Sequence, residues 1–157
     1  MPSLWPSLWC ESDRRGLLIR LRRVTPDTPP RWGRLTARRL LPHLADVVRF
    51  ALGELDASRQ GGRKARFLRH APVKQLVVYW LPFPRHAPKV PALFGTPPAD
   101  WAHDLRVIES LLDRIAARAA ASNPAWPEHP YFGRLSTRAW GVLGYRHMEH
   151  HLRQFGV

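Results

Sequence analysis

The C-terminal stretch YRHMEHHLRQFGV carries three histidines within five positions, His147, His150 and His151. Residues four apart on an α-helix lie on the same face, so His147 and His151 would stand one above the other. Two imidazoles placed in this way can bind one divalent cation, as in any helical H-x-x-x-H pair. The chain holds eight histidines, so this spacing also arises by chance. It indicates a metal site only if a further ligand meets the pair.

His43 is the candidate for that further ligand. It lies on the other strongly amphipathic segment, seven residues after Thr36, which can cap a helix there. Metal sites in helical bundles take ligands from facing helices. The alternative is a surface or core histidine that makes a single hydrogen bond. The other histidines fall in loops or near helix ends and are expected to face solvent: His70, His86, His103 and His129.

Apolar spacing predicts four helices, and Ser12, Thr36 and Ser136 are the candidate N-caps. The four segments run from Ser12 to Val24, from Thr36 to Asp56, from Ala99 to Ala121 and from Ser136 to Phe155. Prolines at positions 26, 29 and 30 prevent the first segment from continuing into the second. In the last segment, Leu143, Met148, Leu152 and Phe155 supply apolar side chains beside the histidines.

Residues 57–99 are the least regular part of the chain. SRQGGRKAR reads as a loop, and LPFPRHAPKVPALFGTPP is interrupted by prolines. VKQLVVYWL between them fits a short helix or a strand, and its periodicity does not decide. Two short connections and one long crossover favour an all-α four-helix bundle, with the long crossover between the second and third helices. A length of 157 residues suits a single domain, 1–157.

The formal charge of +13 raises the question of nucleic-acid binding. Only three of the basic residues are lysines, at positions 64, 74 and 89, and arginine excess can arise from a GC-rich genome. The arginines are spread along the chain without a block of like charges, which argues against nucleic acid as a partner. No apolar run reaches the roughly 18 residues of a membrane span. A lone cysteine, Cys10, and an opening unlike a secretory signal favour the cytoplasm.

Two stretches resemble the DinB-like superfamily of four-helix bundles, which is unrelated to the DNA polymerase of that name. They are WGRLTARRLLPHLADVVRFALGEL and HPYFGRLSTRAWGVLGYRHMEHHLRQFG. More narrowly, the chain resembles a bacterial branch of that superfamily known only as a domain of unknown function. The resemblance covers nearly the whole chain, and YRHMEHHLRQFG is its most specific part. HPYFG also matches the branch, and Pro130, Tyr131 and Phe132 there favour a structural turn that closes the end of the bundle.

In that superfamily one histidine on the second helix and an H-x-x-x-H pair on the fourth bind a divalent metal. The resemblance therefore implies His43, His147 and His151 as ligands, with His150 as a neighbour. Pro42 departs from the family pattern, because proline crowds the preceding turn of a helix. It would either turn His43 away from the site or open a fresh helical segment that keeps it in place.

Three neutral imidazoles leave a bound divalent ion its full charge, so that it acts as a Lewis acid on a bound water or thiol. Zinc is the default for nitrogen ligands, and nickel, iron(II) or manganese fit the same geometry. Gln154 and Asp46 each follow a predicted ligand by three residues and are candidates to orient it.

Relatives of known activity are thiol transferases and a thiol-dependent isomerase, so the resemblance implies a transferase that acts through a low-molecular-weight thiol. The alternatives are a hydrolase that uses metal-bound water and a basic nucleic-acid-binding protein without catalysis. A small-molecule substrate is the expected partner, and the chain is also compatible with a homodimer. No catalytic side chain is assigned.

Overall fold

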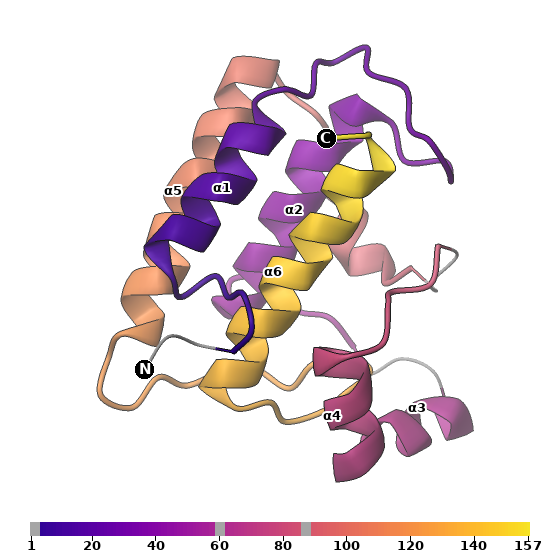
Figure 1. Ribbon diagram of the computed structural model, residues 1–157, viewed down its shortest axis with the longest axis vertical. Helices are drawn as coiled ribbons and strands as arrows, with labels where there is room; N and C mark the ends of the chain where they lie inside the picture. Colours follow the sequence, from indigo (N-terminus) through magenta and orange to yellow (C-terminus); the bar gives the residue numbers. More distant parts are fainter. Residues whose placement is uncertain (1–3, 59–61, 86–88) are drawn as a thin grey trace.

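The computed structural model describes residues 4–58, 62–85 and 89–157, and every regular element in these ranges is helical. Four helices lie side by side, as Figure 1 shows: α1 (Glu11–Leu21), α2 (Ala37–Ala51), α5 (Trp101–Ala119) and α6 (Thr137–Gln154). Within the described residues, β-type pairing is confined to one isolated bridge between His129 and Gly133. The prediction of an all-α chain is confirmed.

Capping residues set the starts of these helices. Ser136 Oγ accepts a hydrogen bond from the backbone N–H of Ala139 at 3.2 Å, which confirms the predicted cap of α6. Thr36 precedes α2 as predicted, although its side chain makes no capping bond. The residue before α1 is Cys10, so the prediction of Ser12 as a cap is wrong. The observed bounds otherwise agree with the predicted ones to within a few residues, except at the end of α2.

The second helix ends at Ala51, earlier than the predicted Asp56. Gly53 adopts a φ of +74°, in the left-handed region that glycine enters without steric cost. Its N–H bonds to the carbonyl of Phe50, and the N–H of Glu54 reaches the carbonyl of Arg49. These two bonds satisfy carbonyls of the last turn, as in other glycine-terminated helices. The apolar pattern continues past the glycine, but the helix does not.

Pro42 lies inside α2 and does not interrupt it. Proline has no backbone N–H, so the carbonyl four residues earlier loses its helical donor, while the turns on either side remain helical. His43 follows directly and is only 4% exposed, facing the interior. Of the two alternatives for this position, the one in which His43 turns away is wrong.

The apolar core lies between the four long helices, because each of them contributes an inward-facing stripe. The fully buried aliphatic side chains include Leu17, Leu21, Leu40, Leu41, Leu44, Ile108, Leu112 and Leu152. α2 packs mainly against α5, and α1 packs against α6. In the described part of the chain, every helix is too short or too polar to span a lipid bilayer.

The segment between α2 and α5 contains three short helices, α3 (Gly62–Leu68), α4 (Ala71–Tyr79) and η1 (Pro91–Phe94). VKQLVVYWL is therefore helical over most of its length, which settles the choice left open by its periodicity. The prediction of a loop for SRQGGRKAR is wrong from Gly62 onward, and residues 59–61 lie outside the described residues. α4 packs against α6, and η1 packs against α2.

Arg146 joins α4 to α6. Its guanidinium donates to the carbonyl oxygens of Val77, Val78 and Leu81 at the C-terminal end of α4. A cation at this end of a helix satisfies carbonyls that have no helical donor and interacts favourably with the helix dipole. The crossover is thus attached to α6 at one end and to α2, through η1, at the other.

Candidate metal centre

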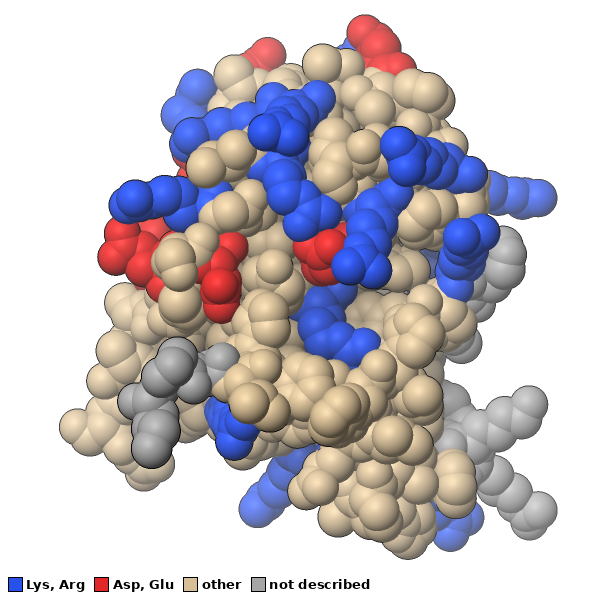
Figure 2. All heavy atoms as spheres, in the orientation of Figure 1, with Lys and Arg blue, Asp and Glu red and all other residues tan. Residues whose placement is uncertain are grey.

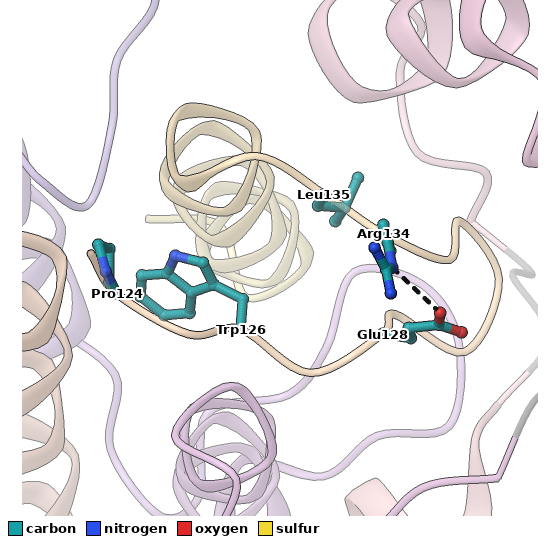
Figure 3. A pocket seen from close by; sticks show the side chains of 5 residues that line it. All are labelled: Pro124, Trp126, Glu128, Arg134 and Leu135. Atoms are coloured by element: carbon teal, nitrogen blue, oxygen red, sulfur yellow. Dashed lines mark ion pairs between the residues drawn. The ribbon is translucent and has the colours of Figure 1, made fainter.

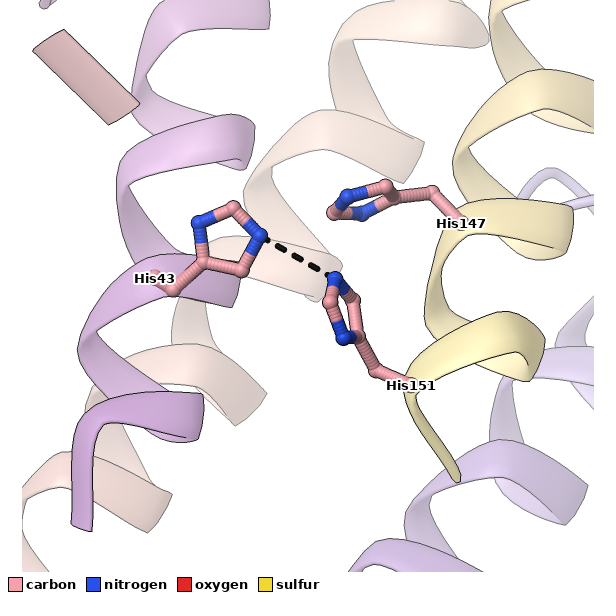
Figure 4. A group of neighbouring side chains, drawn as sticks. All are labelled: His43, His147 and His151. Atoms are coloured by element: carbon pink, nitrogen blue, oxygen red, sulfur yellow. Dashed lines mark hydrogen bonds between the residues drawn. The ribbon is translucent and has the colours of Figure 1, made fainter. Parts of the chain in front are cut away.

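The three predicted ligands meet between two facing helices. His43 projects from α2, and His147 and His151 project from successive turns of α6, as Figure 4 shows. One ring nitrogen of each residue lies within 4.8 Å of the corresponding nitrogens of the other two. His43 and His151 are 4% and 9% exposed, and His147 is partly exposed. The arrangement is a compact group of three imidazoles that reaches the surface on one side.

Hydrogen bonds fix the tautomers of two of these imidazoles. Nδ1 of His43 lies 2.7 Å from the carbonyl oxygen of Leu93, and Nδ1 of His151 lies 2.9 Å from Oε1 of Gln154. Both oxygens can only accept, so each Nδ1 must carry the hydrogen. The amide of Gln154 is oriented in turn, because its Nε2 donates to the carbonyl of Trp32 at 2.8 Å. The Nε2 atom of each imidazole is therefore left with an unshared lone pair.

These two Nε2 atoms, of His43 and His151, face each other at 3.2 Å. With both lone pairs pointing into the same space, neither nitrogen has a donor among the described residues, and the contact is repulsive unless a cation lies between them. Two imidazole nitrogens bound to one tetrahedral zinc at 2.0–2.1 Å are about 3.3 Å apart. The observed separation is therefore compatible with metal coordination, and the ligand nitrogen of His147 lies within 4.8 Å of both.

A proton could also lie between the two facing Nε2 atoms and remove their repulsion, but only at low pH. Burial lowers the pKa of His43 to about 4, and burial together with the neighbouring His43 lowers the pKa of His151 to about 3. Burial followed by the proximity of His151 places the pKa of His147 well below its ordinary value. At neutral pH all three imidazoles are neutral, which is the state in which histidine binds a metal.

Gln154 and Asp46 were both predicted to orient a ligand, and only the first does so. Asp46 is fully buried, but it accepts from the N–H and Oγ1 of Thr96 at 3.0 and 2.5 Å, and from Arg49. These bonds hold the chain after η1 against α2. η1 itself, which directly precedes Gly95 and Thr96, supplies the carbonyl of Leu93 to His43. Asp46 therefore makes no hydrogen bond to a predicted ligand and acts on the site by holding Thr96 in place. The direct partner of His43 is the carbonyl of Leu93, 50 residues further along the chain.

Phe94 covers His43 from the same stretch. The two rings are parallel, with an interplanar angle of 6° and centroids 4.0 Å apart. The imidazole thus has a hydrogen bond at Nδ1, an aromatic ring against its face and a single free direction at Nε2. Such constraints fix a ligand before the metal arrives and reduce the entropy lost on binding.

Comparison of the chain with protein-family models, curated proteins and solved structures found no match in any of the three. What the three histidines do is therefore inferred from their own geometry and chemistry.

The other histidines that the structure describes are not part of the group. His150 lies beside His151, with ring centroids 5.3 Å apart, and packs against Trp32 and Phe83. His70 and His103 are exposed as predicted. His86 lies outside the described residues.

The prediction that His129 faces solvent is wrong. Its Nδ1 accepts from the backbone N–H groups of Tyr131 and Phe132 at 3.2 and 3.3 Å, and its ring packs against Phe132 and Trp140. Burial lowers its pKa to about 3. HPYFG is therefore a turn organised around this imidazole, and Gly133 closes it with a φ of +64°.

A surface hollow lies apart from the histidines, in the connection between α5 and α6. Pro124, Trp126, Glu128, Arg134 and Leu135 line it, as Figure 3 shows. Nε of Arg134 and Oε1 of Glu128 are 3.6 Å apart at its edge. None of its residues is shared with the group of three imidazoles, so the hollow plays no part in the chemistry considered below.

We expect Gln154→Leu to lower the affinity for zinc about 10- to 100-fold, as is typical when the orienting partner of a metal-bound histidine is lost. Leucine removes both the acceptor for His151 and the donor to Trp32. Competition with a chromogenic chelator measures the affinity. Gln75→Leu, at an exposed position of α4, is the matched control and should leave the affinity unchanged. Equal affinities for Gln154→Leu and wild type would contradict an orienting role.

Asp46→Ala is expected to lower the free energy of unfolding by about 3 kcal/mol, because it removes a fully buried carboxylate that accepts from the partly buried N–H of Thr96 and pairs with Arg49. Urea denaturation followed by circular dichroism measures the change. Asp113→Ala, at an exposed position of α5, should change the same quantity by less than about 0.5 kcal/mol. Similar losses in the two variants would show that Asp46 does not anchor the crossover.

Proposed function

We propose that the protein binds one divalent metal ion through His43, His147 and His151, in a DinB-like four-helix bundle formed by α1, α2, α5 and α6. One observation carries the proposal. The Nε2 atoms of His43 and His151 face each other at 3.2 Å while both Nδ1 atoms are committed to oxygen acceptors. A buried polar atom normally has a partner, and here only a cation satisfies both.

Zinc is the preferred ion for three nitrogen ligands, and nickel, iron(II) and manganese are compatible with the same set. Three protein ligands leave a coordination position for water or substrate, as in catalytic zinc sites and unlike the closed sites that serve structure. When bound, the ion supplies Lewis-acid activation of the group that occupies this position. The chain contributes the fixed tautomers and the exclusion of water by Phe94 and the buried helix faces.

The activity that we propose is transfer through a small thiol. The resemblance of HPYFG and YRHMEHHLRQFG to the superfamily supports it, because relatives of known activity use a thiol. The described residues around the three histidines also hold no carboxylate in contact with them that would serve a hydrolase as a general base. The side chains oriented towards the site are imidazoles and aromatic rings, which suit the binding of a soft sulfur ligand.

Elemental analysis of untagged protein tests the metal site, and a polyhistidine tag must be avoided because it binds the same ions. We expect close to one equivalent of a transition metal in the wild type and much less in His151→Ala. An assay of small electrophiles with and without added thiol then tests the activity. Turnover that requires both metal and thiol supports transfer, and turnover without thiol would overturn it in favour of hydrolysis. Unchanged metal content in His151→Ala would overturn the proposed site.

A further inference from the structure

Two basic side chains lie at the edge of the group of three histidines, each held against an aromatic ring. The guanidinium carbon of Arg85 is 4.9 Å from the ring centroid of Trp32, which meets His150 edge to face. Nζ of Lys89 is 5.3 Å from the ring centroid of Phe94. Phe94 in turn lies against His43, with ring centroids 4.0 Å apart. Phe94 alone thus lies between Lys89 and the ligand His43, whereas Trp32 and His150 lie between Arg85 and the ligand His151.

Neither cation has an acidic partner among the described residues, unlike Arg20, Arg49 and Arg153, which pair with Glu149 or Asp46. On α6, Glu149 is turned away from the three histidines and pairs with Arg20 and Arg153. On α2, Asp46 is occupied by Thr96 and Arg49. The two helices that carry the ligands therefore present no free carboxylate to this edge.

The scarcity of acids is general in this chain, which has 25 basic and 12 acidic residues. Figure 2 shows basic side chains spread over the upper part of one face, with acidic side chains at its top, on its left and near its centre. The features specific to the metal centre are the placement of Arg85 and Lys89 and their support by aromatic rings. A ring face attracts a cation without neutralising it, so each side chain is held in place with its charge still available.

Charge at the centre is strongly positive once a metal is bound. Three neutral imidazoles leave a divalent ion with its full charge, and Arg85 and Lys89 add two more positive charges at its edge. Such a concentration of one sign favours ligands of the opposite sign in both affinity and rate of encounter. The guanidinium of Arg85 in particular offers two parallel donors that match a carboxylate.

Trp32 adds a further donor at this edge. Its indole N–H is buried and has no acceptor among the described residues. The same residue carries the ring that supports Arg85, and its carbonyl orients Gln154. Trp32 therefore connects the orientation of the ligand His151 with the placement of the cation.

We infer that the small molecule that meets the metal carries a carboxylate of its own, which Arg85 and Lys89 receive. This inference rests on the proposed function and narrows it from a small thiol to an anionic small thiol. The sulfur meets the metal, and the carboxylate lies at the edge formed by Trp32 and Phe94. A neutral or cationic thiol lacks the second interaction.

The test uses the full-length protein loaded with cobalt(II), whose visible spectrum reports coordination directly. Three thiols of similar size are titrated: 3-mercaptopropionate, 2-mercaptoethanol and cysteamine, which carry negative, zero and positive charge. Growth of the thiolate-to-cobalt absorption band gives a dissociation constant for each. We expect 3-mercaptopropionate to bind about tenfold more tightly than 2-mercaptoethanol, and cysteamine to bind most weakly, with the difference shrinking as salt is added.

Substitutions of Arg85 and Lys89 separate the contribution of these two charges to thiol binding from that of the metal. Arg85→Gln combined with Lys89→Gln should retain the cobalt spectrum and lose most of the preference for the anionic thiol. Comparing the ratio of dissociation constants between proteins cancels intrinsic differences between the thiols. Arg106→Gln, at an exposed position of α5, removes a charge elsewhere and should retain the preference.

The outcomes distinguish the two proposals. Cobalt that binds normally while the wild type ranks the three thiols equally would overturn the anionic substrate and leave the metal site standing. A preference for 3-mercaptopropionate that persists in the double variant would also overturn the anionic substrate and leave the metal site standing. A wild type that fails to bind cobalt at the three histidines would overturn the proposed function, and the inference with it.

Discussion

Alanine in place of His151 is expected to abolish the stabilisation of this protein by zinc. An ion that binds the folded chain and not the unfolded one stabilises it by about 2.7 kcal/mol at 100 times its dissociation constant. For a chain of this size that raises the melting temperature by about 5–10 °C. His151→Ala removes one of the three nitrogens that meet within 4.8 Å. The affinity should fall by more than about 100-fold, since even the loss of an orienting partner costs up to that much.

The neighbouring histidine provides the control for this experiment. His150 lies on the same helix one position earlier, but its ring packs against Trp32 and Phe83 and not among the ligands. His150→Ala should therefore keep the zinc-dependent rise in melting temperature, whereas His43→Ala and His151→Ala should lose it. Differential scanning calorimetry with and without zinc measures all four proteins. A rise that persists in His151→Ala would contradict the assignment of the ligands.

The second large effect is a loss of stability in acid. Free histidine titrates near pH 6.5, whereas burial lowers the pKa of His43 to about 4 and that of His151 and His129 to about 3. Below pH 6.5 the unfolded chain therefore binds protons that the folded chain does not, so the free energy of unfolding falls as pH falls. Each histidine contributes a loss of about 1.6 kcal/mol between pH 6.5 and 5.

Three such histidines together amount to about 5 kcal/mol, which is comparable to the whole stability of a marginally stable domain. Metal-free protein should therefore lose most of its resistance to urea between pH 6.5 and 5, and unfold before pH 4 is reached. Urea titrations in the presence of a chelator measure this. His43→Leu should reduce the difference by about 1.6 kcal/mol, whereas His103→Gln, at an exposed position, should not change it. A flat stability profile over this range would show that the imidazoles are not buried in the neutral form.

Local features of the chain were predictable from sequence because they depend on short-range geometry. The helical repeat places His147 and His151 on one face of any helix that contains them, and Ser136 caps that helix as its side chain suggests. Gln154 could be named as the partner of His151 for the same reason, since three residues span about one turn. The convergence of His43 with this pair depends on tertiary packing, and the resemblance to a known superfamily, not spacing, pointed to it.

The features that could not be predicted depend on contacts distant in sequence. The partner of His43 is the backbone carbonyl of Leu93. Every residue has such a carbonyl, so the residue type at position 93 could not indicate this bond. Asp46 has the spacing of an orienting residue but is occupied by Thr96, which lies 50 residues away. His129 looked like a loop histidine, and its burial follows from packing against Trp140 of α6.

The most direct test of the metal centre is a crystal structure of untagged, zinc-loaded protein with anomalous data recorded at the zinc edge. We predict one strong anomalous peak about 2.0–2.1 Å from Nε2 of both His43 and His151 and from a ring nitrogen of His147. We also predict that Nδ1 of His43 and of His151 retain their bonds to Leu93 and Gln154. Zinc bound elsewhere, or no peak among the three imidazoles, would contradict the account.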